Sequence, residues 1–404
     1  MNYIDVKNFR KYEQLFGDNG PAKIGHVNAV IKGLNEAIAN IPTGGLTGSN
    51  YVYVAADGTD VQNAAALQAA YVTAQGMSPS PTNRITIVAA PGYYNFGTTP
   101  FVMNTDCIDL VSLDGNRSII FNAPYASPFY SSGTIILDFV SNVYVRGVDV
   151  QTKAFAVETY YPGVTIENCK GGQFSFSSSF FNMGSRFVDC EGGNNSFGGN
   201  TGNSYGTFIR CKAGSYSFGL TASGTFTDCT SGGYSFGYNG TANGTFTNCT
   251  STGSLSFGGS YSSGTASGTF LNCKSVDVSF GLVASGTFTN CTAGNDSFGY
   301  YGTASGTFTN CVGSSSCFGY YGNASGNFYN CRGTFAAFGS GGTASGSFNS
   351  CVATSVSFGG GGGTLTGKLY YCRLTQSGQN FPTVSGGGIT RLCITGSNVE
   401  NNQG

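Results

Sequence analysis

Hydrophobic residues follow three different periods along this chain, and each period predicts a different kind of structure. Near the start they stand alternately three and four residues apart: Ile24, Val27, Ile31, Leu34, Ile38 and Ile41. This is the spacing of a heptad seam, and isoleucine at its a positions favours trimers. We therefore expect residues 1–43 to be helical and to form a homotrimer. A short amphipathic helix packed on its own domain explains the same spacing, and the sequence favours neither.

The second region, residues 44–160, is irregular and rich in predicted strands. Apolar runs and alternating positions predict buried strands at 51–55, 85–96, 107–113, 118–122, 134–140 and 143–150. Between the first two lies DGTDVQNAAALQAAYVTAQ, residues 57–75, whose apolar residues have a helical period. A single helix before a ladder of short strands is expected of a cap, because the open end of a solenoid exposes its core.

The third region, residues 161–404, repeats one unit of 18 to 24 residues, marked by cysteines at 169, 190, 211, 229, 249, 273, 291, 311, 331, 351, 372 and 393. A phenylalanine precedes most of these cysteines by three residues, and a second, usually in Ser-Phe-Gly, follows by seven, or in one coil by eight. A unit this short cannot bury its own apolar face, so neighbouring units must cover it. The repeat predicts an all-β fold, a three-sided parallel β-helix of about twelve coils. Its handedness is not visible in the sequence, and right-handed is the commoner expectation.

Each side of the predicted coil has its own residue type. Alanines such as Ala242 mark a narrow inward position, and Asn or Asp before the cysteine, such as Asp228 and Asn248, fits a stacked corner ladder. All variation in length falls between Ser-Phe-Gly and the next Gly-Thr-Phe, so insertions are expected in one surface loop. Threonines that flank the inward phenylalanines form an outward array typical of ice-binding solenoids. Positions such as Leu271 interrupt that array, and β-branched residues also suit any strand.

Composition excludes several classes of protein. Glycine (64 residues) is abundant without a collagen triplet, and 14% aromatic residues argue against disorder. The formal net charge is −1, with no run of like charges, so neither nucleic acid nor an anionic membrane is an expected partner. No stretch resembles a secretory signal or a membrane span, so assembly in the cytoplasm is expected, with non-classical export left open.

The sequence contains few candidate catalytic or metal-binding residues. Beyond Glu191 only Asp228, Asp277, Asp296 and Glu400 carry carboxylates, so glycan cleavage by paired carboxylates would have to use earlier ones, such as Glu167 with Asp189 or Glu191. His26 is the only histidine and makes neither a triad nor a metal site. The cysteine spacing matches no zinc motif. Disulfides between coils are conceivable, but a ladder of free thiols is favoured. We expect no catalytic residue, no metal and no cofactor.

Tyrosines in the variable corner are the candidate binding residues: Tyr238, Tyr261, Tyr300, Tyr301, Tyr320 and Tyr321. Tyrosine among Gly, Ser and Asn supplies rigid amphipathic contacts and is favoured in binding surfaces. Such a ridge suits a glycan or a neighbouring subunit, and an unliganded aromatic ladder is the alternative.

The run DGTDVQNAAALQAA, followed by RITIVAAPGYYNF, resembles the start of pectin-lyase-like β-helices of bacteriophage tailspikes and related virion proteins. The resemblance rests on Asp57 to Asp60, Ala65 to Ala70 and Pro91 to Tyr93. It implies a trimeric spike anchored to a particle by its N-terminus, here residues 1–43. This chain departs from the family in its greater regularity and its low charge, which does not suit an enzymatic groove.

These observations predict a virion appendage, a tail spike, tail fibre or head fibre subunit that binds a host-surface glycan or another virion protein. Three alternatives stay open: a polysaccharide-degrading tailspike, a capsid decoration protein without a receptor, and an ice-binding solenoid. Two early carboxylates in one groove would favour the enzyme, and crystal shaping at low temperature would favour ice binding.

Overall fold

A computed structural model of the chain describes residues 50–121, 135–150, 155–158, 163–176, 182–183, 185–199, 201–376, 381, 384, 386, 388–395 and 398–400. The chain divides into two compact units, Met1–Tyr51 and Val52–Gly404, and the second is described below. The predicted heptad seam from Ile24 to Ile41 lies outside the described residues, so its role in oligomerisation stays a prediction.

One helix, α3 (Asp60–Gly76), packs against strands of the first coils. The Thr59 hydroxyl accepts a hydrogen bond from the amide of Gln62, and the Gln62 side chain accepts one from the amide of Thr59, which closes a capping box. Leu67 is fully buried on the face that meets the core. The helix predicted at 57–75 is therefore confirmed, and it packs on β2 and β3 as expected of a cap.

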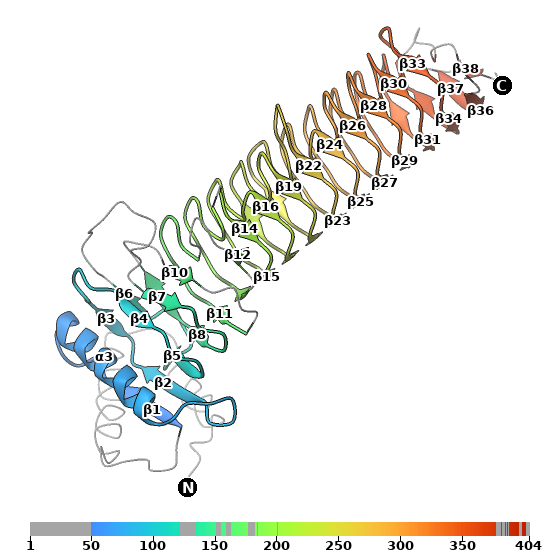
Figure 1. The fold of residues 1–404 in the computed structure, drawn as a ribbon. Coiled ribbons are helices and arrows are strands. Elements are labelled where there is room, and N and C mark those ends of the chain that lie inside the picture. Colours follow the sequence, from blue (N-terminus) through green and yellow to red (C-terminus); the bar gives the residue numbers. More distant parts are fainter. Residues whose placement is uncertain are drawn as a thin grey trace, which may run out of the picture. The chain divides into compact units, whose positions relative to one another are not determined.

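The longest side of the solenoid is a parallel sheet of 16 strands, stacked coil on coil (Figure 1). Its strands, in order, are β1 (Tyr51–Val54), β2 (Ile85–Ala89), β5 (Ile108–Ser112), β8 (Tyr144–Arg146), β11 (Thr165–Glu167), β13 (Arg186–Val188), β15 (Thr207–Ile209), β17 (Thr225–Thr227), β20 (Thr245–Thr247), β23 (Thr269–Leu271), β25 (Thr287–Thr289), β27 (Thr307–Thr309), β29 (Asn327–Tyr329), β31 (Ser347–Asn349), β34 (Lys368–Tyr370) and β36 (Ile389–Arg391). From β11 to β36 it contains one strand per coil in twelve coils, as the cysteine spacing predicts.

Two further sides complete each coil. In the regular coils the second side is a sheet of β12 (Asn182–Met183), β14 (Asn203–Ser204), β16 (Thr221–Ala222), β19 (Thr241–Ala242), β22 (Thr265–Ala266), β24 (Val283–Ala284), β26 (Thr303–Ala304), β28 (Asn323–Ala324), β30 (Thr343–Ala344) and β33 (Thr364–Leu365). In the first coils the corresponding sheet is β4 (Phe101–Met103), β7 (Ile135–Asp138) and β10 (Phe155–Glu158). The sequence pattern missed β4 and β10.

The third side consists of short strands joined by single bridges. Its strands are β3 (Gly92–Tyr94), β6 (Ile119–Phe121), β9 (Val148–Val150), β18 (Thr230–Ser231), β21 (Thr250–Ser251), β32 (Val352–Ala353), β35 (Arg373–Leu374), β37 (Cys393–Thr395) and β38 (Asn398–Glu400). Only β38 runs antiparallel to its neighbour, β37. The three-sided parallel β-solenoid predicted from the repeat is confirmed, and its handedness stays a prediction.

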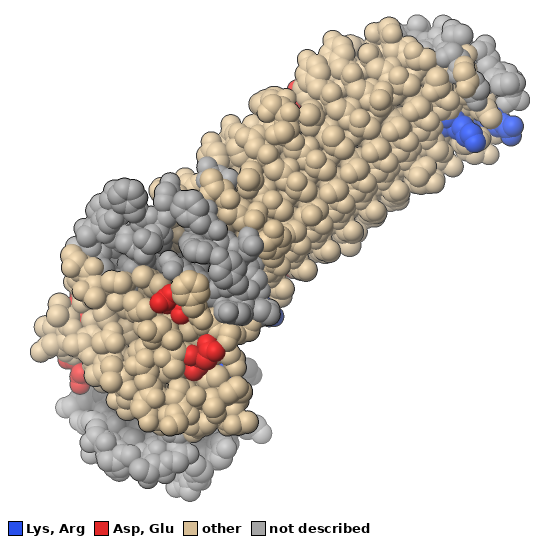
Figure 2. Space-filling view, viewed as in Figure 1, with Lys and Arg blue, Asp and Glu red and all other residues tan. Residues whose placement is uncertain are grey.

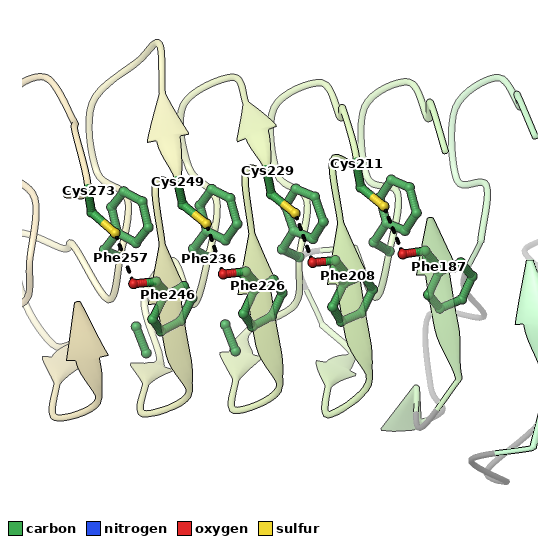
Figure 3. Packing of buried hydrophobic residues seen from close by; sticks show 14 of the residues in the cluster. Phe187, Phe208, Cys211, Phe226, Cys229, Phe236, Phe246, Cys249, Phe257 and Cys273 are labelled. Carbon is green, nitrogen blue, oxygen red and sulfur yellow. Dashed lines mark hydrogen bonds between the residues drawn. The ribbon is translucent and has the colours of Figure 1, made fainter. Parts of the chain in front are cut away.

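Phenylalanine and cysteine fill the regular core, as predicted (Figure 3). Phe246 stacks on Phe270 with ring centroids 4.8 Å apart, and it meets Phe257 edge-on at 5.6 Å. The Cys249 thiol donates to the carbonyl oxygen of Phe226 on the preceding coil, at 3.4 Å. All cysteines of the described residues are free and buried. Stacked aromatic rings contribute about 0.5–1.5 kcal/mol per pair beyond their burial.

Two polar ladders run parallel to this core. At the exposed corner the Asn248 amide donates to Asp228 at 2.9 Å, and Asn272, Asn290, Asn310 and Asn330 continue the chain of amides. Inside, the backbone amide of Ser217 donates to the hydroxyl of Ser235 on the next coil, at 3.3 Å. Asp228 therefore has the structural role at the corner that its position predicts.

The backbone of every regular coil turns through left-handed residues, which the sequence did not predict. The corner asparagines have positive φ, as Asn290 does (54°), and asparagine tolerates this region. The phenylalanine of Ser-Phe-Gly also has positive φ, for example 54° at Phe298. A bulky residue costs roughly 1–2 kcal/mol there, so burial and stacking of the ring must offset that strain.

Candidate functional site

The predicted binding tyrosines lie in the turn between Ser-Phe-Gly and the second side of the coil. Tyr320 and Tyr321 follow Gly319, and the amide of Gly322 closes the turn by donating to the Gly319 carbonyl, at 3.0 Å. A Cβ at Gly322 would lie 1.6 Å from the carbonyl oxygen of Gly302 on the preceding coil, so only glycine fits. Each tyrosine pair is thus set on a turn that packs directly against its neighbour.

Four of these tyrosines form one cluster, called here the tyrosine quartet: Tyr300, Tyr301, Tyr320 and Tyr321. Ring centroids are 4.2 Å apart in the first pair and 4.1 Å apart in the second. Between coils, Tyr301 stacks on Tyr321 at 5.3 Å and Tyr300 on Tyr320 at 5.8 Å. Tyr301 is 58% exposed and Tyr321 is 54% exposed, so the outer rings present open aromatic faces.

The pKa values of the two inner tyrosines of the quartet, Tyr300 and Tyr320, are raised above the ordinary value. A hydrogen bond with Tyr321, together with burial, raises the pKa of Tyr320 to about 12. Burial, the Tyr301 hydroxyl and the charge of Asp296 raise the pKa of Tyr300. Burial and the nearby charge of Asp277 raise the pKa of Asp296. The quartet therefore combines aromatic faces with hydroxyl groups and one adjacent carboxyl group.

The other two predicted tyrosines lie apart from the quartet. Tyr238 packs edge-on against Tyr234 at 4.8 Å and Tyr216 at 6.0 Å, and these two rings stack on each other at 4.7 Å. Tyr216 and Tyr234 were not among the predicted residues, although both immediately precede Ser-Phe-Gly and the repeat marks that position. Tyr261 is 69% exposed, and no ring of the described residues stacks on it. The predicted ridge is thus two separate clusters and one isolated tyrosine.

The carboxylates weighed for catalysis are held by cations. Arg210 binds both oxygens of Asp189, at 2.6 and 2.7 Å. Glu167 accepts a hydrogen bond from the Tyr144 hydroxyl at 3.0 Å and lies 3.6 Å from Arg146. Glu191 has Arg117 at 2.8 Å on one oxygen and Lys170 at 3.6 Å on the other. Of the three, none presents a pair of free oxygens.

Arg117 organises this region, although no sequence motif marks it. It lies between β5 and β6 and reaches over later coils, where it donates to the side chain of Asn168 at 3.1 Å and to the carbonyl oxygen of Asp189 at 2.7 Å. Burial opposes ionisation of Glu191, but the hydrogen bond from Arg117 and the charge of Lys170 hold its pKa below the ordinary value. The hydrogen bond from Arg210 likewise lowers the pKa of Asp189.

Asp149 differs from these carboxylates. It is half-buried, and its Oδ1 has no hydrogen-bond partner among the described residues. Burial raises its pKa, against the opposing charges of Lys170 and Arg117. Asp149, Lys170, Glu191 and Lys212 bridge in that order on successive coils, an alternation of negative and positive charge.

The threonine array lies on the first side in parallel register, where Thr225, Thr245, Thr269, Thr287 and Thr307 are successive partners. Leu271, which is 37% exposed, interrupts the neighbouring column. Within the described residues there is no group of three His, Cys, Asp or Glu side chains that could hold a metal ion. Among the same residues, no helix is both long and apolar enough to cross a membrane.

Comparison with known proteins adds information on the fold alone. No family model matches the chain, and no curated protein matches its sequence. Among solved structures, the A-module of a mannuronan C-5 epimerase from Azotobacter vinelandii is similar over 82% of this chain and 95% of its own, with 10% identity and a TM-score of 0.27. That protein is also a β-helix, and at this identity the likeness says nothing about activity. The chain is an all-β parallel β-solenoid.

Proposed function

We propose that this chain is a non-enzymatic subunit of a virion appendage, a tail spike, tail fibre or head fibre, that binds a glycan through its tyrosines. The observation that carries the proposal is the exposed Tyr301–Tyr321 stack, with centroids 5.3 Å apart on adjacent coils. Tyrosine offers a flat apolar face for the C–H side of a sugar ring and a hydroxyl for its polar edge. Because the turns below are packed, little entropy is lost when a ligand binds.

The virion part of the proposal has a separate basis. It rests on the resemblance of residues 57–96 to tailspike β-helices, a segment in which α3 is followed by β2 and β3. Attachment through residues 1–43 and assembly as a homotrimer belong to the same proposal. Light scattering on the full chain and on a chain lacking residues 1–43 tests this part. A trimer that becomes monomeric on truncation supports it, and a monomer in both forms contradicts it.

Glycan binding is tested on the double variant Tyr301→Ala/Tyr321→Ala. Loss of two exposed aromatic contacts should weaken binding on a glycan array by about ten-fold or more. Tyr329→Ala is the matched control, because Tyr329 is 42% exposed on a strand and lies outside both tyrosine clusters. Equal binding by the wild-type chain and the double variant would exclude the quartet as the site. Absence of any glycan bound by the wild-type chain would favour a decoration protein.

One observation favours a second candidate, the polysaccharide-degrading spike. Asp149 has a raised pKa and an oxygen without a described partner, as expected of a general acid. Glu191, two coils away, has a lowered pKa, and glycosidases use carboxylates with separated pKa values. However, cations occupy both oxygens of Glu191. Release of reducing ends from host polysaccharide by the wild-type chain, lost in Asp149→Asn, would establish this candidate over the binding protein.

A further inference from the structure

The last coils carry three exposed cations on an otherwise nearly uncharged stack. Lys368 begins β34, Arg373 begins β35 and Arg391 ends β36, and all three side chains are exposed. Strand register sets Tyr370 directly beside Arg391, and neighbouring strands lie about 4.8 Å apart. Figure 2 shows Lys and Arg side chains at the end of the coil stack that carries β34 and β36.

Within the part of the chain that the structure describes, these cations lack the carboxylate partners that other cations have. In earlier coils, Arg84, Arg117, Arg146, Lys170 and Arg210 each contact a carboxylate. No described carboxylate lies within ion-pair distance of Lys368, Arg373 or Arg391. From residue 297 onward the sequence contains four Lys or Arg and a single acid, Glu400. The positive charge of Lys368, Arg373 and Arg391 is therefore not neutralised by the described part of the coil stack.

The corner beside them also departs from the repeat. Earlier coils place there the amide ladder that ends at Asn330, whereas the last coils place Tyr371 and Leu392, which are 60% and 50% exposed. Tyr371 and Leu392 have the same positive φ as the asparagines of the ladder, 58° and 51°. Asparagine tolerates this conformation better than tyrosine or leucine does. Stability alone would favour asparagine at these positions. Departures of this kind are expected where a surface serves a function.

We propose that this cationic corner, formed by Lys368, Arg373 and Arg391 around Tyr371 and Leu392, binds a glycan that carries carboxylate or sulfate groups. Guanidinium forks match such groups bidentately, and tyrosine faces contact sugar rings. The inference deepens the proposed function: it adds a second, anion-selective contact at the end of the coil stack, separate from the quartet.

Other polyanions fit the corner less well. Two exposed apolar side chains bury too little surface to anchor a chain to a lipid bilayer. Three cations are also fewer than the roughly six to ten phosphate contacts of a protein that binds nucleic acid tightly. Arginine beside an aromatic residue on a flat strand face suits a stiff polymer whose charges are fixed to rings.

The test uses the full chain and beads of dextran sulfate, carboxymethyl-dextran and neutral dextran. The triple variant Lys368→Gln/Arg373→Gln/Arg391→Gln should elute earlier from both anionic polymers, with affinity lowered at least about five-fold. The control triple Arg186→Gln/Lys212→Gln/Lys274→Gln removes the same number of exposed cations from separate, distant coils and should behave as wild type. Salt near 0.3 M should abolish the difference between wild type and variant, because it screens exposed charges.

Equal retention of the two triple variants would overturn the proposal, since a general charge effect would then suffice. Equal retention of the wild-type chain on neutral and anionic dextran would overturn it as well. Binding to phosphatidylglycerol vesicles but to neither anionic polymer would assign the corner to a membrane instead. The tyrosine variants keep these cations, and the charge variants keep the tyrosines. The proposal for the quartet and the proposal for the cationic corner can therefore be contradicted independently.

Discussion

The first coils and the regular coils solve the same stacking problem with different residues. Between β2 and β11 the inward positions differ from coil to coil. They are aliphatic on the first side, as at Ile87, Val145 and Ile166, and include aromatic residues such as Phe101 and Phe121 on the other sides. Ion pairs join the outer faces. Between β15 and β31 each coil repeats the same phenylalanines, cysteine and alanine, and the outer face has almost no charge. The two regions therefore differ in how strongly they specify which coil lies beside which.

A slip of identical coils by one repeat changes the stacking energy very little. If a regular coil slipped by one repeat, Phe270 would meet another phenylalanine, and the corner asparagine would meet another asparagine. A slip in the first coils would bring like charges together, because Asp149, Lys170, Glu191 and Lys212 alternate. We infer that the first coils set the register and the regular coils extend it.

Removal of one whole coil from each region should produce the largest difference. Deletion of residues 288–307 joins Thr287 to Phe308 and lets Phe270 stack on Phe308, so we expect a folded protein with Tm lowered by no more than about 5 °C. Deletion of residues 166–186 places Glu191 beside Asp149 and Lys212 near Arg117. That protein should fail to fold or lose at least about 10 °C in Tm. Circular dichroism during heating measures both, and equal losses would contradict the division of roles.

Truncation of one core ring should have the next largest effect on stability. Phe270 stacks on Phe246 and Phe288 at 4.8 Å. Phe270→Ala therefore opens a cavity in this stack of rings and should lower the free energy of unfolding by about 3–5 kcal/mol. Phe335→Ala is the control, because this phenylalanine is 52% exposed on a regular coil and should cost less than about 1 kcal/mol. Denaturant unfolding measures the two. A similar cost for both variants would mean that the ladder is not the source of stability.

Loss of the arginine that joins the first coils should have a moderate effect. Arg117→Ala leaves Glu191 with Lys170 as its remaining cation and removes the donor to the Asp189 carbonyl, and we expect a loss of about 1–3 kcal/mol. Arg332→Ala removes the same side chain from a regular coil, where no described carboxylate lies within ion-pair distance, and should change the free energy of unfolding by less than about 0.5 kcal/mol. An equally small effect of the two variants would contradict a role of ion pairs in setting the register.

Acid should separate the two regions in the wild-type chain. Burial opposes ionisation of Asp114, but hydrogen bonds from Ser112, Ser118 and Asn116 lower its pKa from 3.8 to about 2. A carboxyl with a lowered pKa stabilises the fold above its ordinary pKa, and this contribution is lost between about pH 4 and pH 2. The lowered pKa values of Asp189 and Glu191 act in the same direction, whereas the raised pKa of Asp149 acts in the opposite one.

Hydrogen exchange measured by mass spectrometry at neutral and acid pH, corrected for intrinsic rates, tests this expectation. Protection should fall first in the coils of β5 to β13, and it should persist in the nearly uncharged coils of β15 to β31. Simultaneous loss of protection in both regions would show that they unfold as one cooperative unit.

The smallest effect is expected at the exposed amide ladder. Asn290→Ala loses the hydrogen bonds to Asn272 and from Asn310 and puts alanine at positive φ, at a cost of about 1 kcal/mol. Asn290→Gly loses the same hydrogen bonds but suits positive φ, so it should cost roughly half as much. Chemical denaturation of the two variants side by side measures the difference. A larger cost for glycine than for alanine would contradict the left-handed corner.

Much of the fold was predictable from residue spacing. The cysteine interval predicted the coils from β11 to β36, the motif positions predicted which phenylalanines, cysteines and alanines are buried, and the apolar runs predicted most strands of the first coils. The strand β4 (Phe101–Met103) was missed, because three residues at the end of a loop are too few to show a period. The candidate tyrosines were found, but their division into two clusters was not.

The sequence by itself determined the repeat, its inward side chains and the place where insertions are tolerated, because a solenoid requires the same contacts at the same step of every coil. Only the tertiary structure decided the rest. It set phenylalanine residues such as Phe298 in the left-handed region, brought Arg117 to Glu191 across 74 residues, and joined Tyr216 to Tyr238. Local preferences cannot predict these features, because each depends on the coil above or below, and the energy of stacking exceeds the preference of the single residue.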